Sequence, residues 1–205
     1  MTPLLKQQIV GQHVHRLRVE AGLSLRTLAS LTDFSPSFIS QLENGQVSPS
    51  ISSMEKIAAA LGVTLGQFFA ATGGGEGGLI VRAAERTALT SGWSKAEIEA
   101  LSVARPTARL EATLVTLGAG GRSGKHPYPD SREEFAVVMQ GEVVLTLGPD
   151  EHRLRRGDAA TILPGELRLW RNEKRQPARF LIIATRVGHR LSSERKVRRR
   201  AAPAR

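Results

Sequence analysis

The sequence predicts a multidomain chain in which an all-α domain is followed by an all-β domain, and three features of its 205 residues support this division. Residues 1–70 carry Leu, Ile and Ala at helical spacing, whereas residues 79–188 contain short β-branched runs separated by Gly and Pro. Between them, residues 71–78 contain five glycines, which favours a flexible linker. Residues 189–205 are rich in Arg and poor in apolar side chains, so we expect a disordered basic tail.

The composition narrows the class of protein. The formal net charge of +10 suggests a polyanionic partner, although residues 186–205 alone hold eight Lys or Arg and one acid. The chain has no cysteine, which argues against disulfides and thiolate metal sites. It shows neither a signal-peptide pattern nor an apolar run of the roughly 20 residues that cross a bilayer. We therefore expect a soluble, cytoplasmic protein with no membrane partner.

Five short helices are predicted in the first domain, of which the first covers the residues before Gly22. The other four are expected at residues 25–31, 36–44, 53–61 and from 64 onwards. Ser24 and Ser35 have the features of N-caps, and Ser52 with Glu55 forms a predicted capping box for the fourth helix.

The third and fourth helices also carry a specific motif. It comprises Ile39-Ser40-Gln41-Leu42-Glu43-Asn44-Gly45, then Pro49, Ile51 and the run IAAALGV at residues 57–63. This motif resembles the Xre/Cro-repressor family of helix-turn-helix domains over roughly residues 9 to 69. The resemblance implies a transcriptional regulator that binds double-stranded DNA, as a homodimer on a pseudo-palindromic operator.

The resemblance also implies which side chains contact DNA. Base contacts fall to Pro36, Ser37, Ser40 and Gln41, and phosphate contacts to Ser35, Asn44 and Arg26, the last because Leu25 stands where the family has a phosphate-binding Gln. Arg18 and Glu43 match a structural salt bridge of the family, and we expect His13 and His15 to be surface residues. The alternative for any exposed Ser or Gln is that it is merely solvated.

The second domain is predicted to be an antiparallel sheet structure, closed or sandwiched. Its strands are expected at residues 110–117, 135–139, 142–147, 158–163 and 178–185, with residues 93–101 as an interrupting helix or loop. Residues 134–143, from Glu134 to a glycine turn, and residues 157–172, from Gly157-Asp158 to Asn172, resemble the two motifs of the cupin superfamily. This resemblance implies a jelly-roll barrel.

The metal centre common among cupins is not expected here. The resemblance places Tyr128 and Asp130 at the positions of two metal-binding His, and Arg168 at the third. Only Glu134 is retained, and His126 lies two residues out of register. An arginine adds positive charge where a cation would bind, so we expect a pocket without metal or other cofactor.

The same substitutions suggest a ligand pocket. Arg168 presents a planar fork of donors that suits a carboxylate or phosphate, and Tyr128, Trp170 and His126 are candidates to surround it. The alternative is that Arg168 pairs with Glu134 across the barrel and that Tyr128 and Asp130 are rim residues.

Three functions remain open at this point. The first is a sequence-specific regulator whose cupin domain binds a small-molecule effector, with no catalytic residues. The second is a DNA-binding protein whose cupin domain only dimerises. The third is a cupin enzyme with an accessory helix-turn-helix domain, which the missing metal ligands disfavour.

Overall fold

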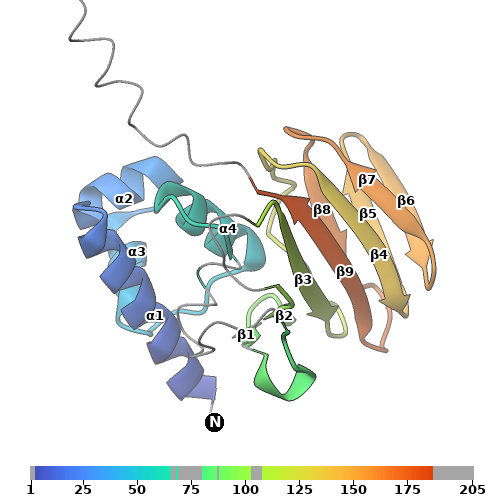
Figure 1. Ribbon diagram of the computed structural model, residues 1–205, viewed down its shortest axis with the longest axis horizontal. Helices are drawn as coiled ribbons and strands as arrows, with labels where there is room; N and C mark the ends of the chain where they lie inside the picture. The colour runs from blue at the N-terminus through green and yellow to red at the C-terminus, as the bar shows by residue number, and fades with distance from the viewer. Residues whose placement is uncertain (1–2, 66–67, 69–79, 87, 103–107, 187–205) are drawn as a thin grey trace, which may run out of the picture.

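The computed structural model places a helical domain beside a β-domain (Figure 1). It describes residues 3–65, 68, 80–86, 88–102 and 108–186. The predicted linker at 71–78 and the predicted tail at 189–205 lie outside the described residues. Within the described ranges, none of the helices combines the length and the apolar character needed to span a bilayer.

The helical domain contains α1 (Pro3–Glu20), α2 (Leu25–Thr32), α3 (Pro36–Glu43) and α4 (Ile51–Ala60). Four helices are therefore described, not the five expected, because the segment after Thr64 lies largely outside the described residues. The helices meet in an apolar core that includes Val14, Leu28, Ile39, Met54 and Ile57.

The helix ends show which local predictions were right. Ser24 and Ser35 cap α2 and α3 as expected. The capping box at Ser52 and Glu55 is wrong, because the N-cap of α4 is Ser50, whose hydroxyl accepts a hydrogen bond from the Ser53 backbone N–H (3.1 Å). Starting the helix two residues earlier moves Glu55 into the second turn, where its side chain is free to extend away from the helix.

The β-domain consists of two antiparallel sheets. Its strands are β1 (Ala88–Ser91), β2 (Ala96–Ala100), β3 (Leu110–Leu117), β4 (Glu134–Gln140), β5 (Glu142–Leu147), β6 (Asp150–Arg155), β7 (Ala159–Ile162), β8 (Arg168–Arg171) and β9 (Ala178–Thr185). One sheet has the order β1-β2-β3-β9-β4-β7 and the other β6-β5-β8. A 3₁₀ turn, η1 (Ala83–Glu85), precedes β1.

This architecture corrects the expected jelly-roll barrel in one respect. Among the described residues the two sheets do not join into a closed barrel, since β8 pairs only with β5 and with two isolated bridges at Arg122 and Tyr128. The five predicted strands correspond to β3, β4, β5, β7 and β9. The helix or loop expected at residues 93–101 is instead largely occupied by β2, which lies between β1 and β3 in the larger sheet.

The space between the two sheets is filled by large apolar side chains. Trp170 from β8 stacks on Phe180 from β9, with ring centroids 4.5 Å apart, and both are fully buried. This contact holds the smaller sheet against the larger one and forms the floor of the pocket described below.

Candidate DNA-binding surface and interdomain pocket

The turn between α2 and α3 is built by local hydrogen bonds. The Ser24 hydroxyl accepts from the Thr27 backbone N–H (3.0 Å), and the Ser35 hydroxyl accepts from the Phe38 backbone N–H (3.1 Å). Between the helices, Asp33 has φ of 56°, a left-handed conformation that Asp tolerates better than most residues. These features end α2 and begin α3 within a few residues, so the angle between the helices is set locally.

The residues predicted to contact DNA lie on the solvent side of this unit. Those that are exposed are Arg26, Ser35, Pro36, Ser37, Gln41 and Asn44, while Ser40 is half-buried. Positions 37, 40, 41 and 44 share one face of α3 because they are three or four residues apart. Asn44 also donates a side-chain hydrogen bond to the Ser40 carbonyl (2.9 Å), which orders the C-terminal end of that face.

The expected salt bridge between α1 and α3 is present. Arg18 Nε donates to Glu43 Oε1 (2.6 Å) and Arg18 Nη2 to Glu43 Oε2 (2.9 Å), while Arg18 Nη1 binds the Leu23 carbonyl (2.9 Å). Although burial opposes ionisation, hydrogen bonds from Arg18 and from His15 hold the pKa of Glu43 below its usual value. The pair therefore fixes the position of α3 against α1, which is a structural role.

The prediction for His13 is wrong. His13 is buried, and its ring packs against Phe68 with centroids 4.5 Å apart, because it lies on the inward face of α1. Burial lowers its pKa. His15 is exposed as expected, but it also bonds Glu43 (2.7 Å).

A pocket lies between the two sheets at the end that faces α4. The helical domain contributes Ile51, Glu55 and Leu65 to its lining. The polar or charged residues that the β-domain contributes are Glu111, Thr113, Ser123, Tyr128, Arg132, Glu134 and Arg168. Its largely apolar residues in the lining are Ile98, Val115, Trp170, Phe180, Ile182 and Ala184. The cavity volume is about 20 Å³.

The pairing of Arg168 with Glu134, one of the two alternatives from the sequence, is present in the structure. Arg168 Nε lies 2.6 Å from Glu134 Oε2 and Nη2 lies 2.8 Å from Oε1, and both residues are 1% exposed. The Arg168 guanidinium also lies over the Tyr128 ring, 4.7 Å from its centroid. Burial raises the pKa of Glu134 despite its partner, and the surrounding acids raise the pKa of Arg168 although burial opposes this.

Four of the five predicted ligand-binding residues line this pocket: Arg168, Glu134, Tyr128 and Trp170. His126 does not line the pocket, because it is exposed on the bend that leads to Tyr128. Within the described residues, the buried indole N–H of Trp170 has no hydrogen-bond acceptor.

Three charged residues that were not predicted, Arg132, Glu111 and Glu55, also line the site. Arg132 makes a bidentate contact with Asp130 (2.8 to 3.1 Å) and binds Glu111 (3.0 Å). Glu55 reaches the pocket from α4, with its oxygens 3.4 and 3.5 Å from Arg168 Nη2. Nothing in the local sequence distinguishes Glu55 from a solvated helix residue, so only the contact between the domains identifies it.

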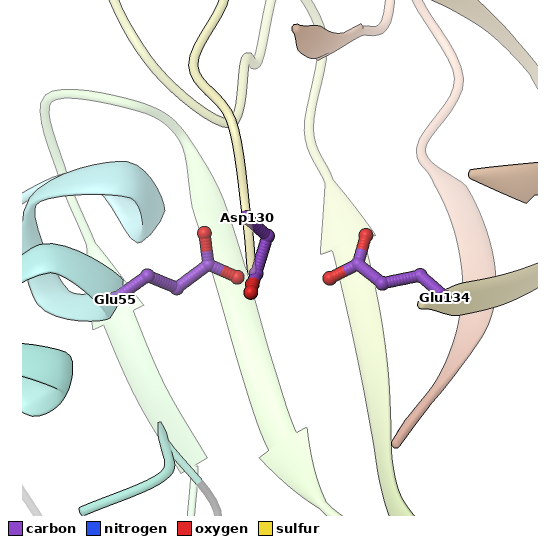
Figure 2. A group of neighbouring side chains, drawn as sticks. All are labelled: Glu55, Asp130 and Glu134. Atoms are coloured by element: carbon purple, nitrogen blue, oxygen red, sulfur yellow. The ribbon is translucent and has the colours of Figure 1, made fainter. Parts of the chain in front are cut away.

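The carboxyl groups of Glu55, Asp130 and Glu134 converge from three different segments (Figure 2). Oxygens of all three lie within 4.8 Å of one another. This donor set does not fit a divalent transition-metal centre, because it offers no imidazole and Arg168 Nη2 already lies within 3.5 Å of all three residues. The guanidinium group supplies the positive charge that a metal would bring.

Burial between the two domains affects the protonation of Glu55. Burial raises its pKa to about 7; Arg168 and Arg132 oppose this rise, and Glu134 and Asp130 add to it. For Asp130, burial also opposes ionisation, but the hydrogen bonds and charge of Arg132 dominate and lower its pKa. Burial thus raises the pKa of both Glu55 and Glu134, whereas that of Asp130 is lowered.

Comparisons with known proteins agree with the two-domain architecture. The family model of helix-turn-helix domains matches residues 14–68, and that of cupin domains matches residues 113–184. The HTH-type transcriptional regulator PuuR of Escherichia coli is 26% identical over 155 residues, which cover 76% of this chain and 83% of PuuR. An uncharacterized HTH-type transcriptional regulator of Sinorhizobium fredii, y4dJ, is 34% identical over 58 residues, covering 28% of this chain and 75% of y4dJ.

A solved structure supports the same fold. The crystal structure of an HTH_3 family transcriptional regulator from Vibrio cholerae matches with a TM-score of 0.72 and 23% identity, covering 91% of this chain and 99% of that one. At this identity the likeness concerns the fold alone. Taken with the family models and the related sequences, it leads to one conclusion: the chain belongs to the helix-turn-helix transcriptional regulators, and it joins their DNA-binding domain to a cupin domain.

Proposed function

We propose that this DNA-binding regulator is controlled by a small organic acid that binds in the interdomain pocket. One observation carries the proposal: the pocket is lined by both domains, with Ile51 and Glu55 from α4 and Arg168 and Trp170 from β8. A ligand in such a pocket binds with different affinity when the domains are together and when they are apart. That difference is what allosteric control requires.

The chemistry of the pocket supports the class of ligand. Arg168 offers a donor group suited to a carboxylate, and the Trp170 indole N–H supplies a further buried donor. The rest of the lining is apolar and includes Val115 and Phe180. We therefore propose an acid with a small apolar body and a second hydrogen-bond acceptor.

On the DNA side, we propose that α3 enters the major groove. Gln41 is placed to contact an adenine through two hydrogen bonds, and Pro36, Ser37 and Ser40 to approach neighbouring bases. In the same arrangement Ser35, Asn44 and Arg26 bind phosphates and set the register of the helix. The exposure of these residues on one side of the α2–α3 unit supports this assignment.

We also propose a homodimer on a pseudo-palindromic operator, with half-sites roughly one helical turn apart. The described part of the β-domain exposes large apolar side chains, including Phe135, Met139 and Leu163, which supports a dimer contact through this domain. Replacing Phe135 and Met139 together by Ser is expected to halve the particle mass measured by light scattering. An unchanged mass would place the contact elsewhere.

We propose that the cupin domain is regulatory and not catalytic. The related proteins named above are transcriptional regulators, and the residues at the cupin metal positions, Tyr128, Asp130 and Arg168, offer no metal centre. A cytoplasmic location fits this role. The main competing function is a cupin domain that only dimerises and takes no ligand.

The test is a DNA titration with and without acids. The purified protein is used to capture genomic fragments, and binding to the best site is titrated at physiological salt against a panel of small organic acids. We expect roughly nanomolar binding and a change of about 5-fold or more with the effector. Arg168→Lys keeps the charge but loses the planar fork, so it should bind the same DNA with a weaker response. No response to any acid would favour the dimerisation function.

A further inference from the structure

Glu55 belongs to the DNA-binding domain, yet its carboxyl group lies in the cupin pocket. Figure 2 shows it pointing from its helix towards Asp130, while Glu134 approaches from the opposite side. The same helix is bound to the cupin domain by a hydrogen bond from the Ser52 backbone N–H to the Ser123 carbonyl (3.0 Å). Docking of α4 and insertion of Glu55 therefore occur together.

The contact of Glu55 with Arg168 is looser than that of Glu134. Glu134 holds Arg168 at 2.6 and 2.8 Å, whereas the oxygens of Glu55 lie 3.4 and 3.5 Å from Nη2. Hydrogen bonds between charged groups are strongest below about 3 Å. Glu134 is thus the firm partner of Arg168, and Glu55 is a second carboxyl group that can be exchanged.

The pocket leaves no room for an organic acid while Glu55 is in place. Its volume of about 20 Å³ is close to that needed by one water molecule. Most of the β-domain lining is held by strand hydrogen bonds, whereas Ile51, Glu55 and Leu65 come from the other domain. The part of the lining that can leave without breaking a sheet is the part contributed by the helical domain.

The charges of the pocket also indicate that an incoming anion would replace Glu55. Four carboxyl groups, those of Glu55, Glu111, Asp130 and Glu134, surround the guanidinium groups of Arg132 and Arg168. Another anion added to this cluster would be repelled by the surplus acids. An anion that takes the place of the ionised Glu55 carboxylate leaves the total charge unchanged, so exchange is favoured over addition above about pH 7.

We propose that Glu55 is an internal ligand of the cupin pocket, and that a small carboxylate effector binds by taking its place beside Arg168. This inference rests on the proposed effector control, and it identifies Glu55 as the group with which the effector competes. When the effector carboxylate occupies that position, α4 loses its anchor and the helical domain separates from the cupin domain. Docked and liganded forms then exclude each other, so effector binding changes the arrangement of the DNA-reading helices.

The first test uses acetate as the probe. Glu55→Ala removes a fragment the size of acetate, so acetate on the order of 10 mM is expected to raise the melting temperature of this variant. Acetamide and sodium chloride at the same concentration are expected to have no such effect. Glu55→Gln, which keeps the volume filled without a carboxylate, and the unmodified protein are the matched controls and should not respond. Equal responses of Glu55→Ala and the unmodified protein to acetate, or no response of either, would overturn the proposal.

A second test locks the docked form. The Ser52 Cβ lies 3.1 Å from the position of a Cβ built on Gly124, slightly shorter than the roughly 3.5–4.5 Å of disulfides. Because the chain has no cysteine, Ser52→Cys with Gly124→Cys provides a single possible pair. We expect the oxidised protein to lose at least about tenfold in affinity for the effector acid and to regain it on reduction.

The outcomes separate the two proposals. If an organic acid alters DNA binding equally in the oxidised and reduced forms, effector control holds and the role of Glu55 as its competitor is wrong. If acetate stabilises only Glu55→Ala but no acid alters DNA binding by the unmodified protein, Glu55 is an internal ligand and the proposed effector control fails.

Discussion

The proposed DNA-reading face of α2 and α3 and the interdomain pocket are built in opposite ways. The first takes its side chains from residues 26–44, which are near one another in sequence and mostly exposed. The second brings together Glu55, Glu111, Arg132 and Arg168, which are far apart in sequence and largely buried. This difference shows that the face depends on the spacing of residues along the helices, whereas the pocket depends on the packing of two domains. Substitutions should therefore alter affinity at the face and stability or domain arrangement at the pocket.

The largest effect is expected at Arg168. Arg168→Ala leaves Glu134 buried without its main partner, so we expect a loss of about 3–5 kcal/mol in the free energy of unfolding of the cupin domain. Urea denaturation measures it. Arg168→Met combined with Glu134→Leu removes both charges and should be much closer to the unmodified protein. A loss below about 1 kcal/mol for the single variant would mean that the pocket behaves like exposed surface.

A substitution of Gln41 tests the expectation that changes at the face alter DNA affinity and not stability. Gln41→Ala should weaken operator binding by about 1–3 kcal/mol and leave the free energy of unfolding within about 0.5 kcal/mol. Titration on operator and random DNA measures the first quantity, and urea denaturation the second. Gln176→Ala, at a glutamine that is also exposed but lies in the cupin domain, is the control. An equal loss of affinity on both DNAs would show that Gln41 does not read sequence.

The pH dependence of docking is the next effect in size. The groups facing Glu55 are Arg168, Glu134, Arg132 and Asp130, and burial raises the pKa of Glu55 to about 7 in the docked form. Since this pKa is raised, the docked form holds the proton more tightly. The stability that protonation of Glu55 gives to the docked form is complete below the ordinary pKa of about 4.5, and it is lost as the pH rises through about 7. Docking should weaken by about tenfold between about pH 6 and pH 8.

Energy transfer between labels on cysteines introduced at Ser30 and Arg156, both exposed, measures this change in domain separation. Glu55→Gln should abolish the dependence between pH 6 and 8, since the amide does not titrate. If the dependence persists in that variant, another acid of the pocket, such as Glu134, is responsible.

The smallest effect is expected at Arg26. Arg26 is proposed to contact a phosphate. Arg26→Ala should therefore weaken binding to all DNA sequences alike and lower the slope of log affinity against log salt by about 1. Arg156→Ala, an exposed arginine of the cupin domain, should leave the slope unchanged. A loss restricted to the operator would reassign Arg26 to base recognition.

Local features were the most predictable from the sequence. The caps Ser24 and Ser35, the pair of Arg18 with Glu43, and the bounds of β3, β5 and β9 follow the expectations closely. Each depends on neighbouring residues or on alternating apolar side chains. By contrast, β6 escaped prediction because Asp150–Arg155 is charged and almost wholly exposed, so it carries no apolar alternation.

In the candidate site, too, the features that depend on local sequence were predictable and those that depend on tertiary contacts were not. Arg168, Glu134, Tyr128 and Trp170 could be selected from the sequence because they occupy positions of the cupin motifs, and all four line the pocket. Whether Arg168 faced Glu134 or a ligand was undecided, since strand pairing partners are not encoded by spacing alone. The capping box was misassigned because several serines in succession, at 50, 52 and 53, are equally good caps.

By itself, the sequence determined the two domain classes, the α2–α3 unit and its exposed polar face, because these depend on periodicity and caps within short segments. Only the tertiary structure decided that Glu55, on α4 of one domain, meets Arg168 on β8 of the other. The physical reason is that the contact joins residues 113 positions apart across a domain boundary. Its geometry follows from how α4 packs against the cupin sheets, which no local pattern specifies.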